Sequence, residues 1–174
     1  MALSQQLNQN FDIWLLDLGR GVLSRFTFDP AIENNPVWSD DGRQIVFASN
    51  RRGVYDLYQK TASGAGTEEL LLATPQTKDQ SDLSPDGHFL LYRSLDPKTS
   101  YDIWAVPLDG DRKPFPFVKT NFDERDGQFS PDGKWIAYQS NESGRFEIYV
   151  QPFPWPRRKA VSFCEWWRTG ALAA

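Results

Sequence analysis

The 174-residue chain is 40% hydrophobic and 14% aromatic, which is enough apolar material for a folded core and excludes a disordered chain. A formal net charge of −4, with no dense stripe of Lys and Arg, argues against nucleic acid as a partner. The single cysteine excludes an internal disulfide, and no apolar run approaches the roughly 20 residues of a membrane-spanning helix.

The N-terminal part predicts a short segment without regular structure followed by a β-hairpin. Residues 1–10 have neither the basic nor the apolar region of a signal peptide, and we expect them to be disordered. Residues 11–28 predict a hairpin, because two apolar stretches flank the turn at Gly19-Arg20-Gly21.

The first strand of this hairpin is repeated along the chain. An aromatic residue, an acid, an aliphatic residue and a second aromatic residue recur at spacings of 44, 46 and 45 residues. The four copies begin at Phe11, Tyr55, Tyr101 and Phe146. Side chains alternate between the faces of a strand, so each copy places hydrophobic groups on both faces, as stacked sheets require.

A second kind of hairpin, built on a Ser-x-Asp-Gly turn, occurs three times, with glycines at 42, 87 and 133. We interpret Asp41, Asp86 and Asp132 as turn residues, because Asp bonds its own backbone and Gly accepts a positive φ. Several short strands in a repeat of about 45 residues are typical of propeller blades.

We therefore predict an all-β protein, a β-propeller fragment of about three four-stranded antiparallel blades. The partial propeller is expected over residues 11–163. Its parts are the hairpin 11–28 and the blades 35–73, 80–119 and 126–163. Residues 164–174 fit no position of the repeat and are expected to be a separate tail.

Polar connectors precede each Ser-x-Asp-Gly hairpin and predict a binding surface. They lead into the innermost strand of a blade, so their side chains would line one mouth of the central channel. The candidate binding residues are Asn34, Asn35, Asp79, Gln80, Arg125 and Asp126. Calcium bound through Asn35, Asp79 and Asp126 is an alternative, but no dense loop of oxygen ligands is present, so we expect no metal and no cofactor.

No catalytic set emerges from the sequence. The only histidine, His88, follows a turn glycine, and there is no Gly-x-Ser-x-Gly motif to supply a nucleophile. The adjacent pair Asp40-Asp41 points to opposite sides and is absent from the other repeats. The Gly/Ser-rich loop 61–66 lacks the spacing of a phosphate-binding loop. We expect the chain not to be an enzyme.

At these hairpins and aromatic-acid strands the sequence resembles the WD-repeat-like β-propeller repeats of the TolB family, over about residues 11–163. It looks closest to the propeller at the C-terminal end of bacterial, notably acidobacterial, transmembrane serine/threonine kinases, on the stretches 12–17 and 149–154. Kinase motifs are absent. Departures from the pattern are Asp40 in place of proline, His88 in place of Lys or Arg, and the ending after Phe163.

The resemblance implies a non-enzymatic protein-interaction or sensory module, extracytoplasmic in the full-length protein, with a partner or ligand at the channel mouth. Two alternatives remain. The chain could be a regulatory gate of a larger kinase or hydrolase, since the repeats also resemble propellers that gate prolyl-oligopeptidase-type proteases. It could instead be a truncated fragment without a function of its own.

The number of repeats predicts self-association. Three to three and a half blades cannot close a ring of four to eight, so we expect a homodimer that forms a six-bladed ring. Residues 11–28 of each chain would complete the partner's last blade beside residues 134–140, displacing residues 146–163. The alternative leaves residues 146–163 in their own blade.

Overall fold

The computed structural model describes residues 1–154 and the two-residue strand 161–162; it divides into two compact units, 1–80 and 81–174. The described residues form strands and turns in four antiparallel sheets, which confirms the all-β prediction. No helix long and apolar enough to cross a membrane is found among them. The expected tail at 164–174 lies outside the described residues.

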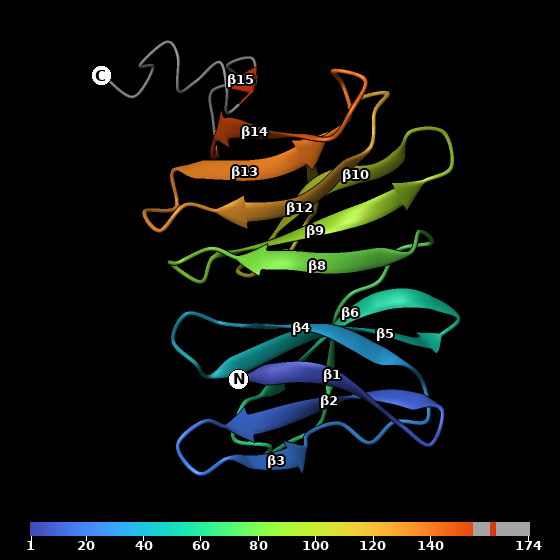
Figure 1. Ribbon diagram of the computed structural model, residues 1–174, viewed down its shortest axis with the longest axis vertical. Coiled ribbons are helices and arrows are strands. Elements are labelled where there is room, and N and C mark those ends of the chain that lie inside the picture. The colour runs from blue at the N-terminus through green and yellow to red at the C-terminus, as the bar shows by residue number, and fades with distance from the viewer. Residues whose placement is uncertain (155–160, 163–174) are drawn as a thin grey trace. The chain divides into compact units, whose positions relative to one another are not determined.

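The first unit contains a three-stranded and a four-stranded sheet (Figure 1). The three-stranded sheet has the order β1-β2-β3, with β1 (Ala2–Leu7), β2 (Asn10–Asp17) and β3 (Val22–Arg25). The four-stranded sheet has the order β4-β5-β6-β7, with β4 (Glu33–Trp38), β5 (Gln44–Arg52), β6 (Val54–Thr61) and β7 (Glu69–Leu72).

Strand β1 corrects the prediction that residues 1–10 are disordered. Residues Ala2 to Leu7 pair antiparallel with Leu15 to Asn10, so the hairpin expected at 11–28 is the outer part of a three-stranded sheet. Asn8 and Gln9 form the turn, both at positive φ (51° and 69°), as a two-residue hairpin turn requires.

Two four-stranded sheets form the rest of the described chain (Figure 1). One has the order β8-β9-β10-β11, with β8 (Lys78–Leu83), β9 (Phe89–Asp96), β10 (Ser100–Pro107) and β11 (Phe115–Val118). The other has the order β12-β13-β14-β15, with β12 (Glu124–Phe129), β13 (Trp135–Ser140), β14 (Glu147–Pro152) and β15 (Val161–Ser162). The three four-stranded sheets are those the repeat predicts.

The pairing of β13 within one chain differs from the expected exchange of strands between chains, which stays a prediction for a dimer. Residues Trp135 to Ser140 pair with β14 on one edge and with β12 on the other, so no edge is left for residues 11–28 of a partner. The structure has the alternative arrangement, in which residues 147–152 stay in their own sheet.

The Ser-x-Asp-Gly turns have the predicted local chemistry. In the second repeat the Ser84 hydroxyl donates to Asp86 (2.5 Å) and accepts the backbone N–H of Phe89 (2.9 Å), while Gly87 has φ of 73°. The turns at Ser39 and Ser130 repeat these bonds. Donors converging on the carboxylate lower the pKa of Asp86, which marks it as a structural turn residue.

Each unit has its own apolar core between its sheets. Ile13 and Phe26 of the first sheet pack with Ile45, Phe47 and Tyr58 of the second, all of them buried. In the second unit the core comprises Leu91, Ile103, Ala105, Phe117, Val118, Ile136, Tyr138, Tyr149 and Phe153. Ile13 and Ile103, the aliphatic residues of two aromatic-acid strands, therefore face the sheet that follows them in sequence.

Candidate functional site

The first strands of two sheets each begin with a bulge that turns a polar side chain outward. The register of β4 shifts between Asn34 and Val37, and that of β12 shifts between Arg125 and Gln128. Asn35 and Asp126 occupy these bulges, at φ of 52° and 53°, and both are exposed. Bulges often re-aim side chains at binding sites, so the two residues are placed as ligand-contacting groups would be.

In the first unit the structure brings four of the candidate residues together. Asn35 Nδ2 donates to Asp79 Oδ1 (3.4 Å), and Gln80 Nε2 donates to the backbone oxygen of Asn34 (3.4 Å). Two acceptors here, Asn34 Oδ1 and Gln80 Oε1, are buried without a hydrogen-bond partner among the described residues. Such unsatisfied buried oxygens cost free energy and are uncommon in folded proteins.

The other two candidates, in the second unit, are already engaged. Arg125 forms a bidentate pair with Asp123 and lies over the rings of Tyr101 (5.5 Å) and Phe146 (5.2 Å). Asp126 lies 3.7 Å from Arg93 in an ion pair and stays largely exposed. Arg125 is therefore held in place, whereas Asp126 can contact a ligand.

The calcium alternative gains no support from the described residues. Among them no group of three or more His, Cys, Asp or Glu residues could hold a metal ion. Asp126 lies in the second unit, whereas Asn35 and Asp79 lie in the first.

Three charged residues, at the start of β4, β8 and β12, are buried, which the sequence did not predict. All three side chains are 0% exposed, although their polar connectors predict exposure to solvent; the residues are Glu33, Lys78 and Glu124. Their spacing of 45 and 46 residues places them at one position of the repeat, and this spacing is the sequence feature that could have indicated a shared structural role. Buried charges need partners, and the three sites find them differently.

Lys78 is neutralised by the acid of an aromatic-acid strand. Its Nζ lies 2.6 Å from Asp56 Oδ1 and also donates to the backbone oxygens of Tyr55 (3.1 Å) and Thr74 (3.2 Å). All three protons of the ammonium group are thus satisfied. In this strand, the acid of the repeated motif therefore has a structural role, which is to pair with a buried lysine.

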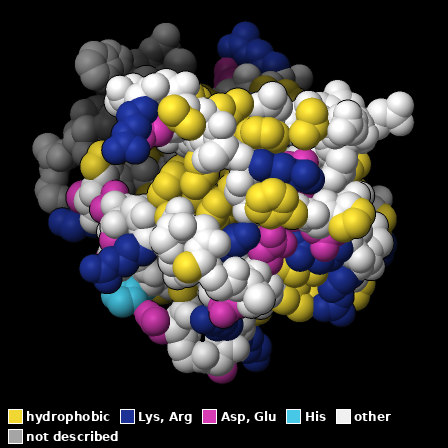
Figure 2. Space-filling model, turned by 90° about the horizontal axis from the view of Figure 1, so that it is seen from below, with side chains coloured by type: hydrophobic (Ala, Val, Ile, Leu, Met, Phe, Trp, Pro, Cys, Tyr) yellow, Lys and Arg dark blue, Asp and Glu magenta, His cyan; other side chains and the backbone are white. Residues whose placement is uncertain are grey.

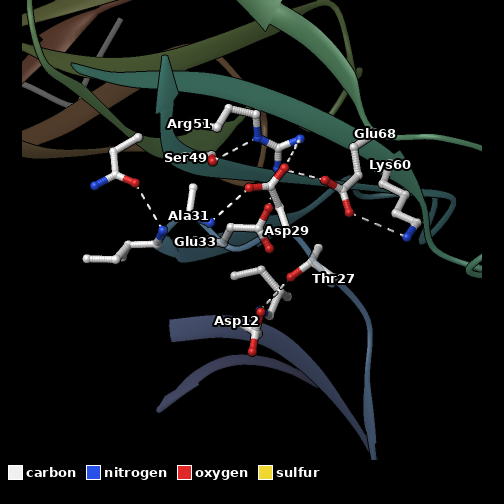
Figure 3. A network of polar contacts seen from close by, with 12 residues as sticks. Asp12, Thr27, Asp29, Ala31, Glu33, Ser49, Arg51, Lys60 and Glu68 are labelled. Carbon is white, nitrogen blue, oxygen red and sulfur yellow. Dashed lines mark hydrogen bonds and ion pairs between the residues drawn. The ribbon is translucent and has the colours of Figure 1, made fainter. Parts of the chain in front are cut away.

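Glu33 belongs to a network centred on Arg51 (Figure 3). Arg51 contacts Glu33, Glu68 (2.7 Å) and Asp29 (3.6 Å), and its guanidinium lies over Tyr58 (4.2 Å). Burial raises the pKa of Glu33 to about 7 although Arg51 opposes the shift. The network ties the connector after β3 to the β4–β7 sheet.

Glu124 has no cation of its own among the described residues. The Thr120 hydroxyl donates to its Oε1 (2.5 Å), while its Oε2 is buried without a partner. Burial, with Asp102 nearby, raises the pKa of Glu124 to about 7. Lys119 instead pairs with Asp102 (3.3 Å) and with Asp96 (2.7 Å).

His88 lies at the surface, outside the group of candidate residues. Its Nδ1 is 2.5 Å from Asp109 Oδ2, and both side chains are more than half exposed. Asp109 raises the pKa of His88. A general base for acyl transfer needs a nucleophile within hydrogen-bond reach, and the contact found for this ring is the carboxylate.

Comparison with known proteins gives a consistent result. The family model of the PD40 TolB β-propeller domain matches residues 1–125. An uncharacterized protein of Agrobacterium fabrum is 29% identical over 150 residues, covering 75% of this chain. The uncharacterized peptidase YuxL of Bacillus subtilis is 27% identical over 179 residues, covering 78% of this chain. The structure of a TolB from Agrobacterium tumefaciens superposes with a TM-score of 0.77 at 20% identity, over 92% of this chain.

These proteins are longer than the chain. The chain spans 47% of the Agrobacterium fabrum relative, 27% of the Bacillus subtilis relative and 59% of the solved TolB structure. The special closeness to kinase-linked propellers stays a prediction.

Proposed function

Because the chain belongs to the TolB β-propeller family, we propose that it is a non-catalytic interaction module that binds a partner through the residues at the start of its first strands. The observation that supports this most directly is the pair of bulges that expose Asn35 and Asp126 at the same position of two repeats. Bulges are strained departures from regular pairing, and two at one position favour a shared use.

The experiment compares a double variant at the two bulges with a single charge-reversal variant elsewhere on the surface. In Asn35→Arg/Asp126→Arg both bulges change, whereas Asp111→Arg changes an exposed residue between β10 and β11. We expect wild type and the Asp111 variant to retain the same partner in affinity capture and the bulge variant to lose it. Equal retention by all three proteins would refute the proposal, as would turnover of ester, peptide or ATP by the purified chain.

We propose an extracytoplasmic setting for the full-length protein, in line with the TolB family. A gate in a larger hydrolase is the second candidate function, favoured by the peptidase among the relatives. In that case adding the chain to a separately expressed hydrolase domain should change its preference for long or short peptides.

We also propose that the outer flank of the first sheet is an association surface. Leu3, Trp14 and Arg25 are direct cross-strand neighbours, and Leu16 is paired with Leu23, so these side chains share one face. Seen from this side, hydrophobic side chains gather on the surface among charged ones (Figure 2). Three buried atoms on this flank have no hydrogen-bond partner in the part of the chain that the structure describes, namely Asp12 Oδ2, Trp14 Nε1 and Arg25 Nε.

The β4–β7 sheet shows how the corresponding face of a sheet is covered. There Tyr58, at the position of Trp14, is packed against Ile13 and Phe26 of the preceding sheet. In the last sheet Ile148 occupies the Ile13 position and is 45% exposed. We therefore propose that the last sheet of a second copy covers this flank. The dimer would hold eight sheets, because residues 1–28 form a sheet of their own, and not the six expected from the sequence.

Light scattering coupled to size exclusion tests this association. A dimer near twice the 20.0 kDa of the chain is expected, and Trp14→Glu should convert it to a monomer. Leu70→Glu, at an exposed position of β7, is the control and should leave the dimer intact. A monomeric wild-type chain at micromolar concentration contradicts the proposal.

A further inference from the structure

The exposed large hydrophobic side chains of the second unit gather at one end of its sheets. Consecutive antiparallel strands place the β9–β10, β11–β12 and β13–β14 connections at the same end, which we call the loop end. At this end lie the exposed residues Leu95, Phe122 and Phe146. Exposed apolar groups that cluster in this way mark interaction sites more often than scattered ones do.

A cleft of about 560 Å³, lined by Leu95 and Phe122 of this group, opens between the β9–β10 turn and the β11–β12 connection. It combines apolar walls with polar groups, as binding sites for peptides and small ligands commonly do. The lining residues that matter here are Leu95, Lys98, Ser100, Asn121, Phe122 and Asn141.

The carboxylates in the cleft are already neutralised. Asp96 accepts hydrogen bonds from Lys119 Nζ (2.7 Å) and from the backbone N–H of Lys98 (2.9 Å). Asp123 is buried and holds both a bidentate pair with Arg125 and the Ser100 hydroxyl. A cationic ligand would therefore have to displace an existing ion pair.

Hydrogen-bond donors, in contrast, are left over. Lys98 is exposed, and its ammonium group forms no ion pair with the described residues. The Asn141 Oδ1 accepts the backbone N–H of Asp123 (3.0 Å), which fixes the amide and leaves its Nδ2 protons for another acceptor. The cleft thus offers a cation and an amide donor beside apolar walls, which complements a carboxylate next to an apolar side chain.

We propose that this cleft binds an extended acidic peptide segment, with a carboxylate at Lys98 and Asn141 and a neighbouring apolar side chain between Leu95 and Phe122. The proposal rests on the proposed function and names the chemistry of the partner. The Phe122 ring and the Leu95 side chain supply apolar area, and the Lys98 ammonium selects the sign of the charge.

The first unit differs at the corresponding place. Its β1–β2 turn has only two residues, Asn8 and Gln9, and Asn10 Nδ2 donates to the backbone oxygen of Asp29 (3.0 Å). The first residue of β2, directly after the turn, is thereby bonded to the connection that follows β3. In the second unit the turn has three residues, 97–99, between the paired Asp96 and Ser100, which leaves room between the turn and the connection.

Fluorescence anisotropy with the full chain tests the proposal. The probes are three fluorescein-labelled, end-capped nonapeptides that alternate Leu with Asp, Leu with Lys, or Ser with Asp. We expect the Leu/Asp peptide to bind best, because it alone presents both groups. Lys98→Glu should weaken its binding at least tenfold, which is about 1.4 kcal/mol. Lys113→Glu, an exposed lysine before β11, is the matched control and should leave binding unchanged.

Three outcomes overturn the proposal: equal binding of the Leu/Asp and Leu/Lys peptides, equal losses in the Lys98 and Lys113 variants, or no binding of the Leu/Asp peptide at millimolar concentration. Phe122→Ser provides a second check that does not involve charge, since it should weaken the Leu/Asp peptide and leave the Ser/Asp peptide unaffected. If the bulge variant still loses its captured partner while Lys98→Glu binds peptide normally, the proposed function stands and the inference on the cleft fails.

Discussion

Replacing Glu124 by Gln should stabilise the protein at pH 8 and remove part of its pH dependence. The folded-state pKa of about 7 lies above the ordinary value of 4.5, so the neutral form is favoured in the folded protein. The contribution to stability is therefore fully present below pH 4.5 and is lost as the pH rises through 7. At about 1.4 kcal/mol per pKa unit, ionisation of Glu124 costs about 3 kcal/mol at pH 8.

Gln reproduces the neutral carboxyl group in shape. Its amide oxygen can accept the Thr120 hydroxyl, as Glu124 Oε1 does, and its Nε2 can donate toward the nearby Asp102. The expected gain at pH 8 corresponds to roughly 2–4 °C in melting temperature per kcal/mol for a chain of this size.

The assay is urea unfolding followed by tryptophan fluorescence from pH 5 to pH 8. Glu142→Gln, at an exposed position in the β13–β14 loop, is the control and should follow the wild type at every pH. If Glu124→Gln loses stability between pH 5 and pH 8 as steeply as the wild type, Glu124 does not titrate in this range and the reasoning is refuted.

Three other predictions test the remaining structural claims. Gly87→Ala should destabilise by roughly 1 kcal/mol in a thermal melt because φ is 73°, whereas Gly87→Asn should lose less; equal losses contradict the turn assignment. Lys78→Met should cost about 3 kcal/mol in urea unfolding, because it leaves buried Asp56 with only the more distant Arg52 (3.9 Å) as a cation, and Lys78→Met/Asp56→Leu should recover part of that loss; no recovery contradicts the pair as the cause. In an NMR titration the pKa of His88 should lie above the ordinary 6.5 and fall in Asp109→Asn, while an unchanged value would show that the contact is absent in solution.

The turns and the aromatic-acid strands could be predicted because their structure is local. Ser84, Asp86 and Gly87 form their bonds within six residues of sequence, and the same residues recur in each copy. Strand β1 could not be predicted in this way. Residues Ala2 to Leu7 carry no repeat motif, and their conformation depends on pairing with β2.

The candidate site was predictable in position and not in detail. The repeat located Asn35 and Asp126, but the bulge that exposes them depends on how the first strand pairs with the second. The polarity of Lys78 predicts exposure to solvent, but the side chain is buried. A charged side chain can be buried when another segment supplies its partner, which here is Asp56.

The different charges at one repeated position distinguish otherwise similar sheets. Lys78 is matched to Asp56, whereas Glu124 lies near Asp102, whose cation Lys119 comes from its own sheet. If the sheet of Glu124 took the place of the sheet of Lys78, Glu124 would be buried beside Asp56, whose native partner is a lysine. Repeats of similar sequence are prone to misassembly during folding, and an unpaired buried charge penalises each wrong pairing. A charge that differs between the repeats, as Lys78 differs from Glu124, therefore makes pairing between the wrong sheets less favourable.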